Sequence, residues 1–501
     1  MRTKEWDEEM IKRKRDSIDH GDSALASVFW KFSERMSAQL VSIVVSIILA
    51  RLLTPEDYGI VSVVMILITL CNALVTGGLG NALIQKKDSD ELDFSSVFYV
   101  SLALAGILYF AVFFLAKPIA VYFQNTDLVW ILRIMAIQIP LSAVESVQQA
   151  NISRQMQFRK FFVATIFGTV VSAFVGIVMA YKGMGPWALV AQYTTNVIVN
   201  TTMMFIVGNW RPQWLFSFGR LRQLLSYGLK ILGATVLDTG FNELRSIIIS
   251  MWYSPADLAV YDNGRKYPNM IVTNINASIN SVIFPVMSKK QGEAEQIKRL
   301  MRSSVRMSSY ILSPMLLGFM AIAERFVSVV LTAKWLICVP FIYITCGMCL
   351  FYPIHTINIQ ALNAIGESGK TLKLEFAKKA INIGILVVSV FFGVVAIALG
   401  GMLVSLISTY INAIYSKKMF GYSLLSQMKD VAPTLYMAGG MAAIVMLIDH
   451  MVIANGWLLL GLDVLIGGGV YVGLSCLFKI DSFHILRQKC VYLLKHFFVA
   501  K

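Results

Sequence analysis

Long apolar stretches alternate with short polar connections along almost the whole chain. Most of these stretches are close to the ~20 residues that span the hydrocarbon core of a bilayer as a helix. They fall near residues 28–50, 59–83, 96–122, 128–150, 161–181, 186–207, 226–251, 257–286, 303–331, 337–364, 374–398, 402–417, 431–453 and 456–478. No stretch alternates apolar and polar residues over the length of a membrane β-strand. The pattern predicts an all-α polytopic membrane protein with about fourteen transmembrane helices.

Composition supports this class and excludes a soluble protein of the same size. The 501 residues are 57% hydrophobic and only 15% charged, whereas soluble domains carry about 25% charged residues. Residues 1–27 are charged, include the run Lys12-Arg13-Lys14-Arg15, and lack the apolar core and cleavage site of a secretory signal. We expect them to form a cytosolic head before the first spanning helix.

The net charge of +15 is unevenly distributed over the connections. Lys and Arg gather after even-numbered helices, as in 154–160, 211–230 and 289–302, and are sparse after odd-numbered helices. Because basic connections stay in the cytosol, this pattern places both termini there. The excess charge indicates topology and contact with anionic membrane lipids, and no nucleic-acid partner is expected.

A short motif recurs about 200 residues apart. Leu53-Thr54-Pro55-Glu56-Asp57-Tyr58-Gly59 returns as Tyr253-Ser254-Pro255-Ala256-Asp257-Leu258-Ala259, each time between two apolar runs. Thr54 or Ser254 is expected to cap the next helix, with Pro at its first position and Asp reaching back to the exposed N–H groups. Such a motif is also a common helix start. A second match, Pro140 with Gln148 and Asn151 against Pro353 with Gln360 and Asn363, favours a true repeat.

The repeat predicts two parallel six-helix halves. The expected parts are an N-lobe at 28–207, a cytosolic inter-lobe linker at 208–225, a C-lobe at 226–418, helices thirteen and fourteen at 431–478, and a basic amphipathic tail at 479–501. Parallel halves are related by a pseudo-two-fold axis along the membrane normal, which favours a substrate path where they meet. The tail is expected on the cytosolic leaflet, with a solvated tail as the alternative.

Polar residues inside the predicted spans are the candidate site, because such residues are costly in a bilayer and normally face a cavity or the bundle interior. Asp238, Asn242 and Arg245 share one face of the seventh helix. Asp262, Lys266, Asn269, Thr273, Asn276 and Asn280 form a stripe along the eighth, bordered by Arg265. Arg35, Gln39, Glu145, Gln148, Glu243 and His355 are further candidates for the polar lining of a cavity.

Two interpretations fit these side chains. The acids Asp238, Glu243 and Asp262 match the bases Arg245, Arg265 and Lys266 in number, so the groups can neutralise one another as glue between helices. Alternatively, the stripe lines a hydrated cavity in which Arg245, Arg265 and Lys266 bind an anionic headgroup such as a diphosphate. The length of the polar face favours the second interpretation.

Other motifs point away from catalysis and cofactors. Cys346 and Cys349 form a CxxC inside a predicted span and are expected to be buried free thiols. The runs Gly77-Gly78-Leu79-Gly80 and Gly467-Gly468-Gly469 resemble phosphate loops but are expected to serve close helix packing. The five histidines show no metal-ligand spacing, and His355 is expected to make an ordinary hydrogen bond, with proton relay as the alternative. We therefore predict no catalytic residues, no metal and no cofactor.

Four segments carry a resemblance to a known family. They are Leu49 to Gly59, Asn81 to Lys87, Ile283 to Lys289, and Leu331 with Lys334-Trp335 and Pro340. In this order they resemble turns and helix ends of the Wzx-type oligosaccharide flippases, the polysaccharide-transport branch of the MOP superfamily. The resemblance covers nearly the whole chain and is closest to the colanic-acid and teichuronic-acid exporters.

The resemblance implies a 6 + 6 + 2 helix bundle in a bacterial inner membrane. Such a protein is a non-enzymatic flippase that moves an undecaprenyl-diphosphate-linked oligosaccharide to the outer leaflet by alternating access, for O-antigen, capsule or exopolysaccharide synthesis. A polysaccharide polymerase and a chain-length regulator are implied partners, and the coupling ion is not assigned. The charges of helices seven and eight match no family pattern, so their role rests on the physical argument.

Two other functions are weighed against this one. A drug or cation antiporter of the same superfamily needs an acid without a partner base in its cavity, whereas the acids here are matched by bases. A polysaccharide polymerase or ligase needs a sizeable external loop with acid–base groups, and no external connection exceeds roughly a dozen residues.

Overall fold

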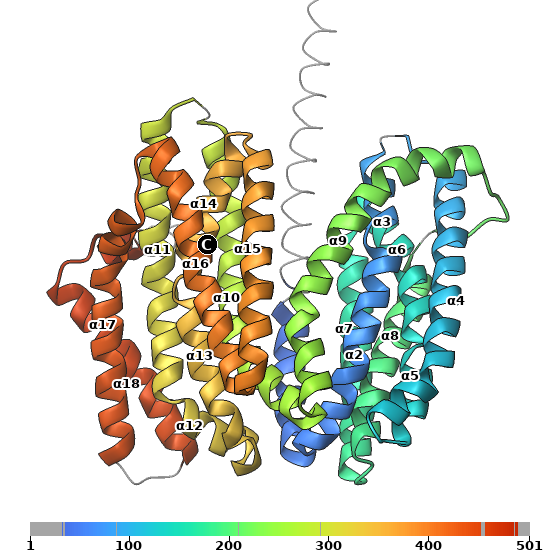
Figure 1. Cartoon of the computed structure of the whole chain (residues 1–501), viewed down its shortest axis with the longest axis horizontal. Helices are drawn as coiled ribbons and strands as arrows, with labels where there is room; N and C mark the ends of the chain where they lie inside the picture. Colours follow the sequence, from blue (N-terminus) through green and yellow to red (C-terminus); the bar gives the residue numbers. More distant parts are fainter. Residues whose placement is uncertain are drawn as a thin grey trace, which may run out of the picture. The chain divides into compact units, whose positions relative to one another are not determined.

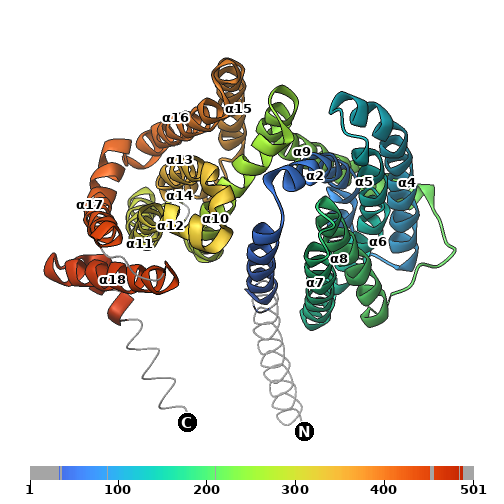
Figure 2. The ribbon, with the colours of Figure 1, turned by 90° about the horizontal axis from the view of Figure 1, so that it is seen from below.

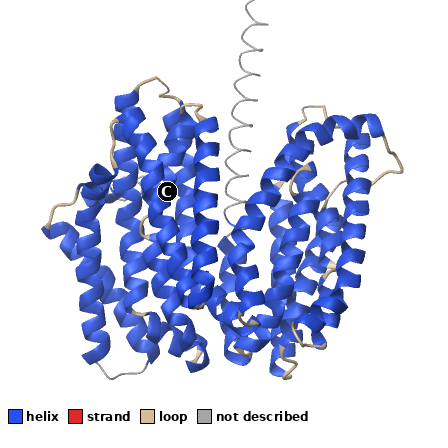
Figure 3. Ribbon diagram, in the orientation of Figure 1, coloured by secondary structure: helices blue, strands red, loops and turns tan. Residues whose placement is uncertain are grey.

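The computed structural model describes residue 33 and residues 36–86, 88–208, 210–290, 292–451, 456–484 and 486–488. Within these ranges the regular structure is helical and no strand occurs (Figure 3). The predicted head at 1–27 and Arg35 lie outside the described residues. The fold class predicted from the hydrophobic pattern is confirmed.

The helices follow the predicted apolar stretches, with the largest shifts of eight or nine residues in bounds of α9, α11, α15 and α16. They are Met36–Leu52, α2 (Pro55–Thr76), α3 (Leu79–Gln85), α4 (Glu91–Tyr122), α5 (Asp127–Met135), α6 (Gln138–Arg154), α7 (Phe158–Tyr181), α8 (Pro186–Val207), α9 (Phe218–Trp252), α10 (Pro255–Ser288), α11 (Ala294–Ala321), α12 (Ala323–Phe326), α13 (Val339–Cys349), α14 (Tyr352–Ala364), α15 (Ser368–Ser389), α16 (Val394–Phe420), α17 (Leu424–Met451) and α18 (Gly456–Leu477), with short π and 3₁₀ turns at Val327–Leu331, Ala333–Cys338 and Val390–Phe392.

Several predicted spans are broken. The stretch 59–83 is divided into α2 and α3, and the stretch 128–150 into α5 and α6. Among the described helices, eight are long and apolar enough to cross a membrane, and a ninth span results if α11 and the bent segment Ala323–Leu331 cross together. α9 and α10 fall outside this group because of the polar residues they carry. The total of fourteen spans stays a prediction.

Both copies of the duplicated motif start a helix as predicted. At α2, the Thr54 hydroxyl accepts a hydrogen bond from the Asp57 N–H at 3.3 Å, and the Asp57 carboxylate accepts one from the Thr54 N–H at 2.9 Å. At α10, the Asp257 N–H donates to the Ser254 hydroxyl at 3.1 Å, and that hydroxyl donates to the Asp257 carboxylate at 2.6 Å. These caps satisfy N–H groups that would otherwise lack a partner at each helix start.

The chain divides into two compact units, Met1–Leu258 and Ala259–Lys501. In the first unit, α9 contacts α2, α3 and α4, and it lies alongside α2 and α3 in Figure 1. The sequence placed this helix in the second half, after a linker at 208–225. That division stays a prediction, and the structure shows that α9 packs on helices of the first unit.

The reason is that the linker is bound to α4. The Trp210 indole donates a hydrogen bond to Glu91 at 2.8 Å, and the ring packs between Phe94 and Phe98. Backbone N–H groups of Gln213 and Ser217 then donate to the hydroxyls of Ser95 and Ser96, at 3.1 and 3.0 Å. These contacts guide the start of α9 onto the first unit, and the sequence pattern alone does not reveal them.

Close packing holds α9 in place at the break between α2 and α3. A Cβ added to Gly78 would lie 2.3 Å from the carbonyl oxygen of Gly228, and the Thr235 hydroxyl donates to the Gly77 carbonyl at 3.2 Å. Only glycine allows this approach of two backbones. The predicted packing role is confirmed for Gly77 and Gly78. By contrast, Gly80 has more room, with its nearest atom 3.6 Å from an added Cβ.

In the second unit, α17 packs along α11 and α18 packs along α17 (Figure 2). Tyr310, Met437 and Tyr471 form the centre of an apolar cluster between these helices. Beyond α18 the chain turns at Lys479, where φ is +48°, and Phe483 and Leu486 pack against the same cluster. The beginning of the predicted membrane-surface tail thus packs on protein, and residues 489–501 lie outside the described residues.

Candidate functional site

The polar stripe of α10 forms a partly open face of the second unit. Lys266 and Thr273 are exposed, and Asp262, Asn269 and Asn276 are half-buried. Arg265 lies at the border, where its guanidinium carbon is 4.9 Å from the centre of the Tyr261 ring. Asn280 belongs to the same helix by position, but its side chain is outside the described ones.

The opposite face of α10 fixes the orientation of this stripe. A Cβ added to Gly264 would lie 2.5 Å from the Cβ of Phe341, so α10 and α13 pack at very short distance. The buried rings of Tyr261 and Tyr267 contact Phe341 and Phe326, with centroids 5.7 and 5.2 Å apart. Because this face is packed, the polar stripe points out of the core of the second unit.

The polar group of α9 belongs to the first unit. Asp238 and Asn242 are exposed, and the Asn242 amide donates a hydrogen bond to the Asp238 carboxylate at 3.2 Å. Glu243, which follows Asn242 directly, and Arg245, three residues after Asn242, are half-buried. The end of the helix is held by Tyr122, whose hydroxyl donates to the Met251 carbonyl at 3.0 Å. Arg245 and Arg265 therefore lie in different units.

Other predicted lining residues take part in interactions inside a unit. Glu145 accepts hydrogen bonds from the amides of Gln149 at 2.8 Å and Asn200 at 2.9 Å, which joins α6 to α8. Gln148 is fully buried and donates to the Trp210 carbonyl at 3.2 Å, so it serves the binding of the linker. Gln39, on helix Met36–Leu52, is half-buried.

His355 makes the ordinary hydrogen bond expected for it. Its Nδ1 lies 2.9 Å from the amide nitrogen of Asn412. The amide nitrogen can only donate, so Nδ1 accepts in this contact. The neighbouring pair Asn358 and Gln427 is fully satisfied by reciprocal amide hydrogen bonds of 2.9 and 3.1 Å. This part of α14 is held by a polar network inside the second unit.

A charged cluster that the sequence did not predict joins α11 to α17. Asp430, at the start of α17, binds Arg302 and Arg306 of α11, with shortest N–O distances of 2.8 and 2.6 Å. The Tyr422 hydroxyl donates to the same carboxylate at 2.9 Å, and burial raises the pKa of Tyr422. Arg302 had been assigned only to topology and Arg306 had not been singled out, because their partner lies about 125 residues away in the sequence.

The described residues offer no evident metal site. They contain no group of three or more His, Cys, Asp or Glu side chains that could hold a metal ion. Cys346 and Cys349 are buried free thiols, as predicted. What the site offers is a set of cations, amides and hydroxyls that can bind polar and anionic groups without covalent chemistry.

Several curated proteins named for polysaccharide synthesis are similar to this chain in sequence. The succinoglycan biosynthesis transport protein ExoT of Rhizobium meliloti is 26% identical over 291 residues, covering 58% of each chain. The teichuronic acid biosynthesis protein TuaB of Bacillus subtilis is 23% identical, covering 62% of this chain and 65% of its own. The matches thus span less than two thirds of the length of these two relatives. The lipopolysaccharide biosynthesis protein WzxC of Escherichia coli is 21% identical over 73% of this chain and 75% of its own.

Solved structures of membrane transporters share the fold. An inward closed conformation of the lipid II flippase MurJ has a TM-score of 0.73, with 14% identity over 90% of this chain and 98% of its own. An inward-facing multidrug resistance MATE transporter of the MOP superfamily has a TM-score of 0.58, with 14% identity over 77% of this chain and 94% of its own. The model of the family described as polysaccharide biosynthesis protein matches residues 48–340, more than half of the sequence. With the predicted resemblance confirmed in this way, the chain belongs to the polysaccharide biosynthesis protein family.

Proposed function

We propose that the protein is a flippase that moves a lipid-diphosphate-linked oligosaccharide, with an undecaprenyl carrier, from the cytosolic to the outer leaflet of a bacterial inner membrane. Family membership supports the link to surface polysaccharide. The single structural observation that carries the proposal is the partly open polar stripe of α10 in an otherwise apolar helical protein. Such a stripe is stable in a membrane only where it meets water or a polar ligand.

The chemistry of the stripe fits this substrate class. Arg245, Arg265 and Lys266 are the proposed ligands of the diphosphate or of acidic sugars, because guanidinium and ammonium groups form charge-assisted hydrogen bonds with phosphate oxygens. Asn269, Thr273 and Asn276 offer neutral donors and acceptors suited to sugar hydroxyls. Arg245 belongs to the first unit and Arg265 to the second.

The proposed orientation follows the positive-inside rule, with both termini in the cytosol. The protein would act without a catalytic step of its own. A polysaccharide polymerase and a chain-length regulator would use its product at the outer surface. Deleting the gene should trap a lipid-linked oligosaccharide on the cytosolic leaflet, detected by extraction of the lipid and by its protection from an external glycosidase. Accumulation on the outer leaflet instead would contradict a role in translocation.

The site assignment is tested by the double variant Arg245→Ala with Arg265→Ala. Each arginine is expected to contribute ~1.5–3 kcal/mol through charge-assisted hydrogen bonds, so export should fall on the order of 100-fold or more. The measurement is surface polysaccharide per cell, normalised to the amount of protein inserted in the membrane. Lys230→Ala is the matched control, because it removes an exposed cation from α9 outside the stripe. Undiminished export in the double variant would contradict the assignment of Arg245 and Arg265 as substrate ligands. It would not contradict the proposal that the protein is a flippase.

A drug antiporter is the second candidate, since the MATE transporter shares the fold. Deletion that raises drug sensitivity while surface polysaccharide stays normal would favour that function over ours.

A further inference from the structure

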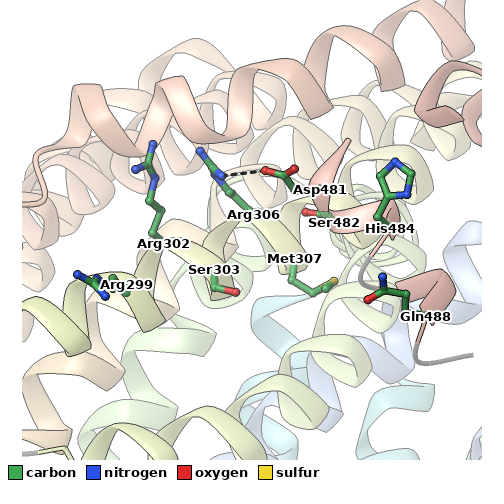
Figure 4. Close-up of a pocket in the computed structure, with 9 residues that line it drawn as sticks. All are labelled: Arg299, Arg302, Ser303, Arg306, Met307, Asp481, Ser482, His484 and Gln488. Atoms are coloured by element: carbon green, nitrogen blue, oxygen red, sulfur yellow. Dashed lines mark ion pairs between the residues drawn. The ribbon is translucent and has the colours of Figure 1, made fainter. Parts of the chain in front are cut away.

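A cavity separate from the α10 stripe lies in the second unit beside the first half of α11. It has a volume of about 480 Å³ and opens between α11 and the segment after α18. Figure 4 shows its main polar side chains: Arg299, Arg302, Ser303 and Arg306 from α11, and Ser482 and His484 from the segment after α18. The flippase function proposed above does not involve this cavity.

The positive charge of the cavity comes from the spacing of three arginines along α11. Arg299, Arg302 and Arg306 follow the spacing i, i+3 and i+7, so all three arginines lie on one helix face. The opposite face is buried through Ile297 and Met301 in the core of the second unit. This amphipathic division directs the arginines away from the core and toward the cavity.

Asp430 holds two of the three arginines in a fixed position. Arg302 donates its Nε–H to both carboxylate oxygens, at 2.9 and 2.8 Å, and Arg306 donates from Nε at 3.1 Å and Nη2 at 2.6 Å. The Asp430 side chain is only 4% exposed, whereas the Arg302 side chain is 55% exposed. The buried carboxylate therefore restrains these side chains, whose outer edges stay open to the cavity.

Donors remain available after this pairing. The terminal nitrogens of Arg302 donate to no residue in the described parts of the chain. Arg299 is exposed and makes no hydrogen bond or ion pair within those parts. Arg306 also lies 3.6 Å from Asp481, a side chain that is 81% exposed. Three arginines thus face two carboxylates, Asp430 and Asp481, and the cavity keeps an excess of positive charge and of N–H donors.

We propose that this cavity binds a phosphate group, with Arg299 and the terminal nitrogens of Arg302 as its principal ligands. The planar guanidinium fork matches two oxygens of a phosphate, and the hydroxyls of Ser303 and Ser482 add neutral donors. A carboxylate is a weaker candidate, because it offers two oxygens to the donors of Arg299 and Arg302, whereas a phosphate offers three or more.

The position of the cavity indicates where the phosphate comes from. Tyr310 follows Arg306 by one helical turn, about 6 Å along the axis at 1.5 Å per residue. It already belongs to the apolar cluster, with its ring centre 5.1 Å from that of Tyr471. The arginines therefore lie at the boundary between the charged end and the apolar body of α11. A phosphate at such a boundary is expected to be the headgroup of a membrane lipid.

The test is phosphate binding by the purified protein in detergent, which requires no transport. Phosphatidylglycerol is counted on the intact protein by native mass spectrometry, and inorganic pyrophosphate is titrated in a thermal-shift assay. Arg299→Gln removes an exposed ligand without touching Asp430, so the fold is expected to persist. Loss of one charge-assisted contact should weaken binding roughly tenfold. Arg302→Lys, which keeps the charge but removes the fork, should also weaken it.

Lys298→Gln is the matched control, because Lys298 is a neighbouring cation on α11 that pairs with Glu295 at 3.7 Å and does not line the cavity. Weaker phosphatidylglycerol binding in Arg299→Gln, but not in Lys298→Gln, supports a lipid headgroup site. Weaker pyrophosphate binding with unchanged lipid binding supports the phosphate chemistry and overturns the lipid source. Equal behaviour of the two glutamine variants overturns the proposal. A failure of the flippase assay would leave each of these results unchanged.

Discussion

α2 and α10 begin with the same motif and then diverge. At an offset of 200 residues, Ser62, Met65, Ile66, Thr69 and Ala73 of α2 correspond to Asp262, Arg265, Lys266, Asn269 and Thr273 of α10. In α2 these positions are half-buried or buried, and Ile66 is 9% exposed in the core of the first unit. In α10 Lys266 and Thr273 are exposed. The shared cap determines where both helices start. The polar stripe, which only α10 carries, distinguishes α10 from α2.

The two copies of the repeat therefore differ in the role of the helix that follows the motif. α2 contributes to packing of the first unit against α6, α8 and α9. α10 uses one face for packing and keeps the other polar. The proposed binding site needs both kinds of helix, because side chains that bind a ligand are held in position by well-packed neighbouring helices.

The strongest test exchanges residues between the two helices. Ile66→Lys places a cation in a packed apolar site and should destabilise the protein by several kcal/mol, seen as a large drop in melting temperature or loss of inserted protein. Lys266→Ile should preserve the melting temperature and lower export about tenfold or more, because it removes a proposed substrate contact. If Ile66→Lys folds normally and Lys266→Ile unfolds, the conclusion that α2 packs at this position and α10 does not is contradicted.

A second test concerns the close contact between the two copies of the motif. An added Cβ at Gly59 would lie 2.2 Å from the Pro255 carbonyl oxygen, at the end of the first unit. Gly59→Val should therefore lower stability by about 1–3 kcal/mol or more through overpacking, measured as the melting temperature of the purified protein. Gly240→Ala on α9 is the control, because nothing lies within 4 Å of its added Cβ. Equal melting temperatures for the two variants would contradict the described contact.

The smallest expected effect is that of the caps themselves. Thr54→Ala and Ser254→Ala each remove one side-chain acceptor from a helix start and should each cost about 1 kcal/mol of stability. Because both caps share the hydrogen bond from the Asp N–H to the capping hydroxyl, the two losses should be similar, and export per inserted molecule should change little. A selective loss of export in Ser254→Ala would mean that the second cap also affects function.

Much of the fold was predictable because it depends on local patterns. Apolar stretches near the thickness of a bilayer gave most of the helices, although one bound each of α9, α11, α15 and α16 differs from the predicted one by eight or nine residues. The S/T-P-x-D motif gave the capped starts of α2 and α10. The polar stripe of α10 was also visible, because positions separated by three and four residues share a helix face. Its proposed ligand rests on the chemistry of the side chains and stays a prediction.

What the sequence determined by itself was the class of the protein, the helix starts, the distribution of charge and the family. Only the tertiary structure decided that α9 belongs to the first unit, that Gln148 is buried beneath the linker, and that Asp430 joins Arg302 and Arg306 beside a cavity. Those features depend on residues 60 to 130 positions apart, such as Gln148 with Trp210 and Arg302 with Asp430. Helix formation depends on neighbouring residues and therefore gives a periodic pattern. Pairing between residues far apart in the chain gives no such pattern in a single sequence.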